Sequence, residues 1–279
     1  MREKKTTKTF INIVIYFLLF LAGDLLSSIL FDLLFSVVKF KSSELYVIPR
    51  MLGCLILTVL FFWLYTTKLL HLKMKDFGIN LNMKKWGVIL SILLPAFVVA
   101  TFFIVGKAEV KTFALNNTVL IVIASVTMAL KAGILEEMLF RGFIMKLLEN
   151  RWNKYIAILV PSFIFSLVHI PSMENFTIGG VVLLIISGTL VGIMFSIVTY
   201  KGKSISNSIF MHSVWNFVMV TGILHITTEH GAYGEPIFSI IIPSNNILLT
   251  GAGFGAEASL VAIIGYSIVC GIVLVLTKE

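Results

Sequence analysis

Six polar residues stand inside runs of apolar sequence, and three of them, Glu136, Glu137 and Arg141, follow one another closely. A charged side chain at the centre of a membrane-spanning helix costs about 2.5–3.5 kcal/mol on insertion scales, so a functional site is the default interpretation. On a helix, Glu137 and Arg141 stand four residues apart and can form an ion pair. Glu136 is rotated by about 100° and faces another direction. We therefore expect a structural Glu137–Arg141 pair and a Glu136 that is free for chemistry.

The other three polar residues are His169, which follows Phe165 by four positions, and the pair His212 and Asn216, which share one face of a helix. The depth of each residue below the expected cytoplasmic end of its helix can be calculated from a rise of about 1.5 Å per residue. The depths are roughly 20, 21, 12 and 18 Å for Glu136, His169, His212 and Asn216. Because these depths agree within a couple of helical turns, one shared cavity is expected.

Such a cluster has the groups needed to hydrolyse an acyl bond. A carboxylate in a pocket poor in water can act as a general base on water, and an imidazole beside it can hold that water or move a proton. A second histidine with an asparagine amide can donate hydrogen bonds to an oxyanion. No GxSxG motif is present, and neither Cys54 nor Cys270 has a histidine nearby in sequence, so water activation is favoured over a protein nucleophile.

A metal ion is the rival to water activation by glutamate and histidine. Glu136, His169 and His212 would form a two-histidine, one-carboxylate set of the kind that binds zinc. The HExxH spacing that places two ligands on one helical turn is absent. Both mechanisms therefore remain open at this point.

The composition indicates an integral membrane protein. Of 279 residues, 58% are hydrophobic and 13% are charged, whereas soluble domains are about 45–50% apolar and about 25% charged. Hydropathy predicts an all-α, polytopic fold of about eight transmembrane helices. They are expected near 10–38, 46–70, 86–105, 118–149, 155–170, 178–200, 204–224 and 257–277.

The charge distribution orients these helices. The formal net charge is +8, but Lys and Arg are concentrated in the N-terminal segment with Arg2, Lys4 and Lys5, and in alternate connections. This is the positive-inside pattern, so both termini are expected to be cytoplasmic. Contact with anionic lipid headgroups, not nucleic acid, accounts for the basic residues. The first hydrophobic run is too long for a cleaved signal peptide and is interpreted as an uncleaved span.

Three further features predict contacts between helices. Gly188, Gly192 and Ser196 recur at four-residue steps, which lets a neighbouring helix approach closely. Lys131 is costly in an apolar helix unless it is paired, and we expect a partner in Asp24 or Asp32. The long connection 225–256 is expected to be an outward-facing loop, partly re-entrant around 237–242.

The polar motifs resemble a known family. Glu136-Glu137-x-x-x-Arg141, Phe165-x-x-x-His169 and His212-x-x-x-Asn216 are similar, in order, to the three motifs of the CPBP intramembrane proteases. That family comprises CAAX prenyl endopeptidases and bacterial bacteriocin-processing and self-immunity (Abi) proteins. The resemblance covers the core at 118–224, within a single transmembrane domain that spans 1–279.

The resemblance implies a glutamate-type intramembrane endopeptidase in a cell membrane, expected to be a bacterial plasma membrane. Glu136 and His169 would activate water, His212 and Asn216 would stabilise the oxyanion, and Glu137 and Arg141 would orient them. The substrate would be a peptide or a prenylated or otherwise lipidated protein. The glutamate mechanism needs no cofactor, although family members are often labelled metalloproteases. A non-catalytic membrane protein that binds a peptide is the alternative from another class.

Overall fold

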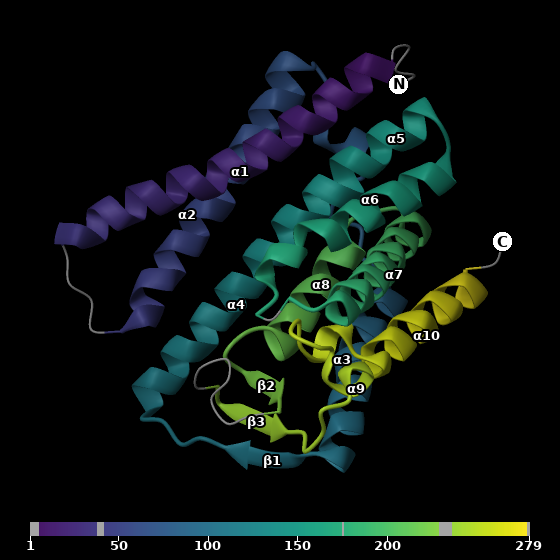
Figure 1. The fold of residues 1–279 in the computed structure, drawn as a ribbon. Helices are drawn as coiled ribbons and strands as arrows, with labels where there is room; N and C mark the ends of the chain where they lie inside the picture. The colour runs from purple at the N-terminus through teal and green to yellow at the C-terminus, as the bar shows by residue number, and fades with distance from the viewer. Residues whose placement is uncertain (1–5, 38–41, 175, 229–235, 278–279) are drawn as a thin grey trace.

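The computed structural model describes residues 6–37, 42–174, 176–228 and 236–277, and these are mainly helical (Figure 1). The longer helices are α1 (Thr6–Val37), α2 (Ser43–Leu64), α3 (Lys85–Val105), α4 (Leu115–Glu137), α5 (Met145–Arg151), α6 (Lys154–Val168), α7 (Ile178–Gly202), α8 (Ser206–Met219) and α10 (Leu260–Leu276). The short helical elements are η1 (Tyr65–Leu69), η2 (Met74–Phe77), η3 (Met138–Ile144), η4 (Ile170–Ser172), α9 (Ile247–Thr250) and η5 (Ala256–Ala258). The prediction of an all-α, polytopic membrane fold is confirmed.

The predicted hydrophobic segments coincide with helix, except that α8 ends at Met219 and the end of the predicted segment 204–224 leads into β2, which begins at Leu224. Two of the longest segments are continuous through π-helical turns. η1 extends α2, and η3 joins α4 to α5. Within the described part of the chain, six helical segments are long and apolar enough to cross a membrane. They are Thr6–Val37, Ser43–Leu69, Lys85–Val105, Leu115–Arg151, Lys154–Ser172 and Ile178–Gly202. α10 is apolar but shorter, and the number of crossings therefore stays a prediction.

The described ends of the chain lie at one end of the bundle. The Arg151 guanidinium at the end of α5 donates to Thr6 Oγ1 at the start of α1, over 2.6 Å from Nη2. Lys201, near the end of α7, donates through Nζ to the Thr277 carbonyl over 2.9 Å. This arrangement is the one expected of two termini on the same side of a membrane. Arg2, Lys4 and Lys5, on which part of the orientation rests, lie outside the described residues.

A small sheet closes the opposite end of the bundle (Figure 1) and was not predicted. Its strands are β1 (Lys107–Val110), β2 (Leu224–Thr227) and β3 (Phe238–Ile241), in the order β1-β3-β2. β3 pairs antiparallel with β1 and parallel with β2. The predicted re-entrant segment at 237–242 is thus a strand, because its backbone groups pair with the connection that follows α3. Residues 229–235 of the same connection lie outside the described residues.

The small-residue ladder brings α6 and α7 into backbone contact. A Cβ atom built on Gly192 would lie 2.7 Å from Ser162 Cβ and 2.8 Å from Ser162 Cα. A Cβ built on Gly188 would lie 2.8 Å from Ser166 Cβ. These separations leave no room for a side chain, which confirms the expected close approach.

The α1–α2 hairpin lies along one side of the bundle (Figure 1) and is joined to it by aromatic rings and by one ion pair. Tyr16 of α1 stacks on Phe143 of η3 with ring centroids 4.0 Å apart. Lys131 Nζ of α4 lies 3.6 Å from Asp24 Oδ1 of α1, which confirms one of the two predicted pairings. Asp32 instead accepts a hydrogen bond from the Tyr46 hydroxyl.

Candidate active site

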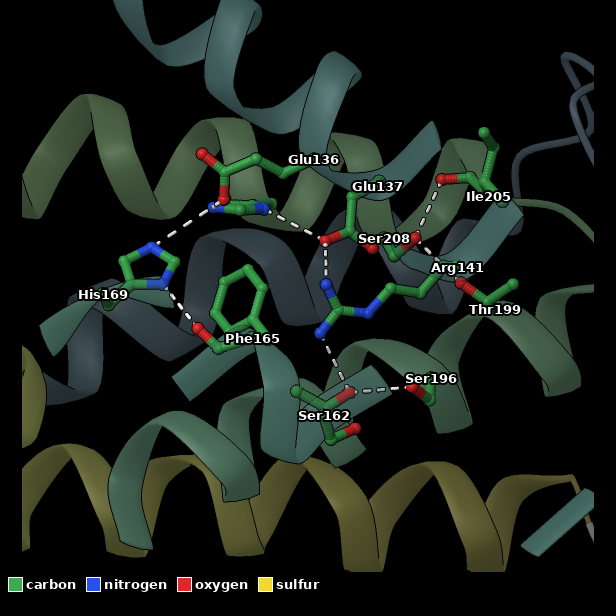
Figure 2. Close-up of polar contacts among 12 residues, drawn as sticks. Glu136, Glu137, Arg141, Ser162, Phe165, His169, Ser196, Thr199, Ile205 and Ser208 are labelled. Atoms are coloured by element: carbon green, nitrogen blue, oxygen red, sulfur yellow. Dashed lines mark hydrogen bonds and ion pairs between the residues drawn. The ribbon is translucent and has the colours of Figure 1, made fainter. Parts of the chain in front are cut away.

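Two adjacent glutamates mark the point where α4 passes into the π-helical η3, and their side chains diverge (Figure 2). The Glu137 side chain is completely enclosed, and Arg141 Nη1 donates to Glu137 Oε1 over 2.9 Å. The predicted ion pair is therefore present. The Glu136 side chain is 20% exposed and faces away from this pair.

Arg141 is buried behind the two glutamates. Its Nη2 donates to the Gly192 carbonyl of α7 over 3.1 Å, and its guanidinium carbon lies 4.7 Å from the Phe165 ring centroid. The Phe195 ring centroid is 5.3 Å from the same carbon. One cation thus fastens η3 to α6 and α7, which carry these partners.

His212, on α8, bridges the two glutamates. Its Nδ1 lies 3.1 Å from Glu137 Oε1, and its Nε2 lies 3.9 Å from Glu136 Oε2. Its ring stacks on Phe195 with an interplanar angle of 17°. Because an ionised carboxylate only accepts hydrogen bonds, Nδ1 carries the proton of the contact with Glu137. This contact holds the ring so that Nε2, its other nitrogen, faces Glu136.

His169 approaches Glu136 from the other side, at the residue where α6 ends. Its Nδ1 donates to the Phe165 carbonyl over 2.7 Å, which fixes the ring and leaves Nε2 without a proton in the neutral form. That Nε2 lies 3.9 Å from Glu136 Oε2. Figure 2 shows these contacts converging from helices that are distant in sequence.

Glu136 Oε2 is thus 3.9 Å from both imidazole Nε2 atoms, and no described residue donates a hydrogen bond to it. A separation of 3.9 Å is too long for a direct hydrogen bond but allows one water to contact two groups. A buried carboxylate oxygen without a donor is costly, so a polar molecule is the natural partner at this position.

All four residues predicted to be catalytic line one cavity of about 420 Å³. They are Glu136, His169, His212 and Asn216. Glu137 and Arg141 do not line it, and Glu137 contacts the His212 ring through Nδ1. Most of the remaining wall is apolar, including Leu184, Val191 and Phe195.

The cavity has a second carboxylate, Glu257 of η5, which the motifs did not single out. Trp215 Nε1 donates to Glu257 Oε2 over 2.9 Å, and the Tyr266 hydroxyl donates to the Glu257 carbonyl over 3.1 Å. Burial raises the pKa of the Glu257 carboxyl, and the negative charge of Glu136 adds to that rise. The Trp215 N–H opposes it.

The positions of the same side chains also bear on the alternative mechanism, in which a metal ion activates water. Among the residues that the structure describes, no set of three or more His, Cys, Asp or Glu side chains is arranged to hold a metal ion. The Nε2 atoms of the expected ligands His169 and His212 each lie 3.9 Å from Glu136 Oε2.

Comparison with known families agrees with the motif assignment. Residues 118–218 match the family model described as "Type II CAAX prenyl endopeptidase Rce1-like". The predicted resemblance is confirmed for this segment, which contains all six polar motif residues and Phe165. No curated protein matches the chain. The match supports an intramembrane endopeptidase of the CAAX type.

Proposed function

We propose that this chain is an intramembrane endopeptidase that hydrolyses a peptide bond with water activated by Glu136 and His169. The observation that carries the proposal is the position of Glu136 Oε2, 3.9 Å from two imidazole nitrogens in a cavity between membrane helices. The proposed substrate is a peptide or a prenylated or otherwise lipidated protein.

The tautomer of His169 determines how water is held. Since Nδ1 donates to the Phe165 carbonyl, Nε2 accepts a hydrogen bond from water. Glu136 accepts a hydrogen bond from the other O–H of the same water. A lone pair of the water oxygen then points away from both acceptors and towards the substrate carbonyl. Transfer of a proton to Glu136 as the C–O bond forms gives a tetrahedral oxyanion.

His212 and Asn216 would stabilise that oxyanion. The contact with Glu137 requires a proton on His212 Nδ1, so donation from Nε2 requires the doubly protonated imidazolium. The Glu137 carboxylate compensates the added charge. The oxyanion then expels the amine as the C–N bond breaks, and Glu136 returns its proton to the leaving nitrogen.

The test is Glu136→Gln, which keeps the shape of the side chain and removes the base. We expect cleavage of membrane peptides to fall by at least about 10²-fold, the usual contribution of a general base. Substrates are identified as membrane peptides that accumulate in cells carrying the variant. Glu174→Gln, an exposed change that does not line the cavity, is the matched control.

An unchanged cleavage rate in Glu136→Gln would contradict the proposal and would favour a peptide-binding protein. Metal content of the purified protein, combined with activity after chelation, separates the water-activating mechanism from the metal alternative. If Glu136, His169 and His212 hold zinc, activity is lost on chelation and returns with the metal.

A further inference from the structure

The cavity wall contains acidic side chains but no lysine or arginine among its described residues. The acidic side chains are those of Glu136 and Glu257. Histidine, asparagine, serine, tryptophan and tyrosine supply its other polar side chains. A ligand that fills this space therefore meets two carboxylates, and histidines are the only groups of the described wall that can carry positive charge.

Glu257 is fixed so that one carboxylate oxygen remains available. Oε2 accepts the Trp215 N–H, while no hydrogen bond from a described residue reaches Oε1. A carboxylate partly removed from water is stabilised by a cation or by several donors. Here the direct hydrogen bond comes from one neutral donor, and the charges of His169 and His212 act without a hydrogen bond to the carboxylate. Burial raises the pKa of this carboxyl, as expected when compensation is incomplete.

Glu257 lies beside the groups proposed to stabilise the oxyanion. Its partner Trp215 is the residue before Asn216 on α8, and all three line the cavity. The charges of His169, His212 and Glu136 also act on the Glu257 carboxyl. A substrate group that contacts Glu257 would therefore be only a few residues from the scissile bond.

We infer that Glu257 is a specificity-determining residue that binds the lysine or arginine side chain of a peptide substrate next to the scissile bond. This inference rests on the proposed endopeptidase function and names its substrate class. The cavity therefore favours a substrate with a cationic side chain at this position.

The simpler explanation is that Glu257 only holds Trp215 in place. Glu257→Gln distinguishes the two roles, because the glutamine carbonyl can still accept the Trp215 N–H while the charge is lost. Trp215→Phe is the reciprocal variant, which keeps the charge and removes the hydrogen bond. Thermal unfolding in detergent shows that each variant is folded before its activity is compared.

The experiment uses proteoliposomes and three pools of quenched fluorescent peptides, acetylated and amidated at their ends. The pools are identical except that one position carries lysine, norleucine or glutamate. We expect the wild type to cleave the lysine pool with a kcat/KM about tenfold above that for norleucine. Glu257→Gln loses this preference through KM, Glu257→Lys favours the glutamate pool, and Trp215→Phe keeps the lysine preference. Glu174→Gln, which removes a charge outside the cavity, keeps the wild-type ratio.

A wild type without lysine preference, or a preference that survives in Glu257→Gln, would overturn the inference. Glu136→Gln separates this failure from a failure of the proposed function. If Glu136→Gln is inactive and the lysine ratio is insensitive to Glu257, only the specificity role is wrong. If Glu136→Gln cleaves all pools at the wild-type rate, the endopeptidase assignment fails and the specificity role fails with it.

Discussion

A single oxygen, Glu137 Oε1, accepts hydrogen bonds from both Arg141 and His212. The two donors differ in purpose. Arg141 offsets the buried negative charge, while His212 is oriented by it so that Nε2 points into the cavity. Glu137 Oε1 therefore contributes both to stability, through Arg141, and to the position of His212 in the site. Mutations can separate these two effects.

Glu137→Gln should destabilise the protein, because it leaves the Arg141 guanidinium buried without its counter-charge. Breaking a buried ion pair in this way costs about 3–5 kcal/mol. The double variant Glu137→Gln/Arg141→Met removes both charges and should recover part of that loss, although activity stays low because the His212 imidazolium no longer faces a carboxylate. Thermal unfolding and peptide cleavage measure the two effects. Equal instability of the double and single variants would contradict the pairing as a charge effect.

The raised pKa of Glu257 predicts how the stability of the protein changes with pH. The folded carboxyl binds a proton more tightly than the unfolded one, whose usual pKa is about 4.3. Stability contributed by Glu257 is therefore fully present below that value and is lost as pH rises through the folded pKa. The unfolding temperature of the wild type, measured relative to Glu257→Gln in detergent, should fall across this window. A difference that is constant with pH would contradict the shift.

Sequence predicted the six motif residues but not Glu257. The polar motif residues lie within apolar helices, where the free-energy cost of a polar side chain is enough to indicate a functional role. Glu257 follows a glycine-rich stretch typical of a surface loop, and its importance depends on Trp215, which is 42 positions away. A contact over that distance has no local pattern, so only the folded chain shows it.

Among the elements, α7 does most to position the site. It supplies the carbonyl that holds Arg141 and the glycine face against which α6 packs. The glycine spacing predicted this packing directly. The π-helical turn η3 was not predictable in the same way, because such turns arise from tertiary packing and have no distinct sequence period.

Gly192→Ala should separate α6 from α7, since its methyl group would lie 2.7 Å from Ser162 Cβ. Overpacking of this kind costs about 1–3 kcal/mol, and a displaced α6 also moves His169 away from Glu136. We expect a lower unfolding temperature and weaker cleavage. Gly271→Ala in α10 is the matched control, because a Cβ there meets nothing within 4 Å. Equal effects of the two substitutions would show that helix contact is not the cause.

Across the whole molecule, the segment 118–218 that matches the protease family is joined to parts that the match does not cover. β1 follows α3, outside the matched segment, and pairs with β3 beyond the other limit of the match. The α1–α2 hairpin packs against η3 through aromatic rings. Hydropathy predicted these apolar helices, but it could not predict how they attach, because pairing between distant segments depends on particular side chains and not on the apolar character of each helix as a whole.

The Asp24–Lys131 pair tests whether this attachment depends on charge. Lys131→Asp places two acids together on adjoining helices, and one uncompensated charge in a membrane helix costs about 2.5–3.5 kcal/mol, so the amount of protein in membranes should fall several-fold. The exchange Asp24→Lys with Lys131→Asp should restore it, since opposite charges again face each other over the separation of 3.6 Å. Asp32→Lys with Lys131→Asp is the control and should not restore it, because Asp32 is bonded to Tyr46 and not to Lys131. Quantitative immunoblots of membranes compare these variants with the wild type. Rescue by Asp32→Lys, or none by Asp24→Lys, would contradict a specific Asp24–Lys131 attachment.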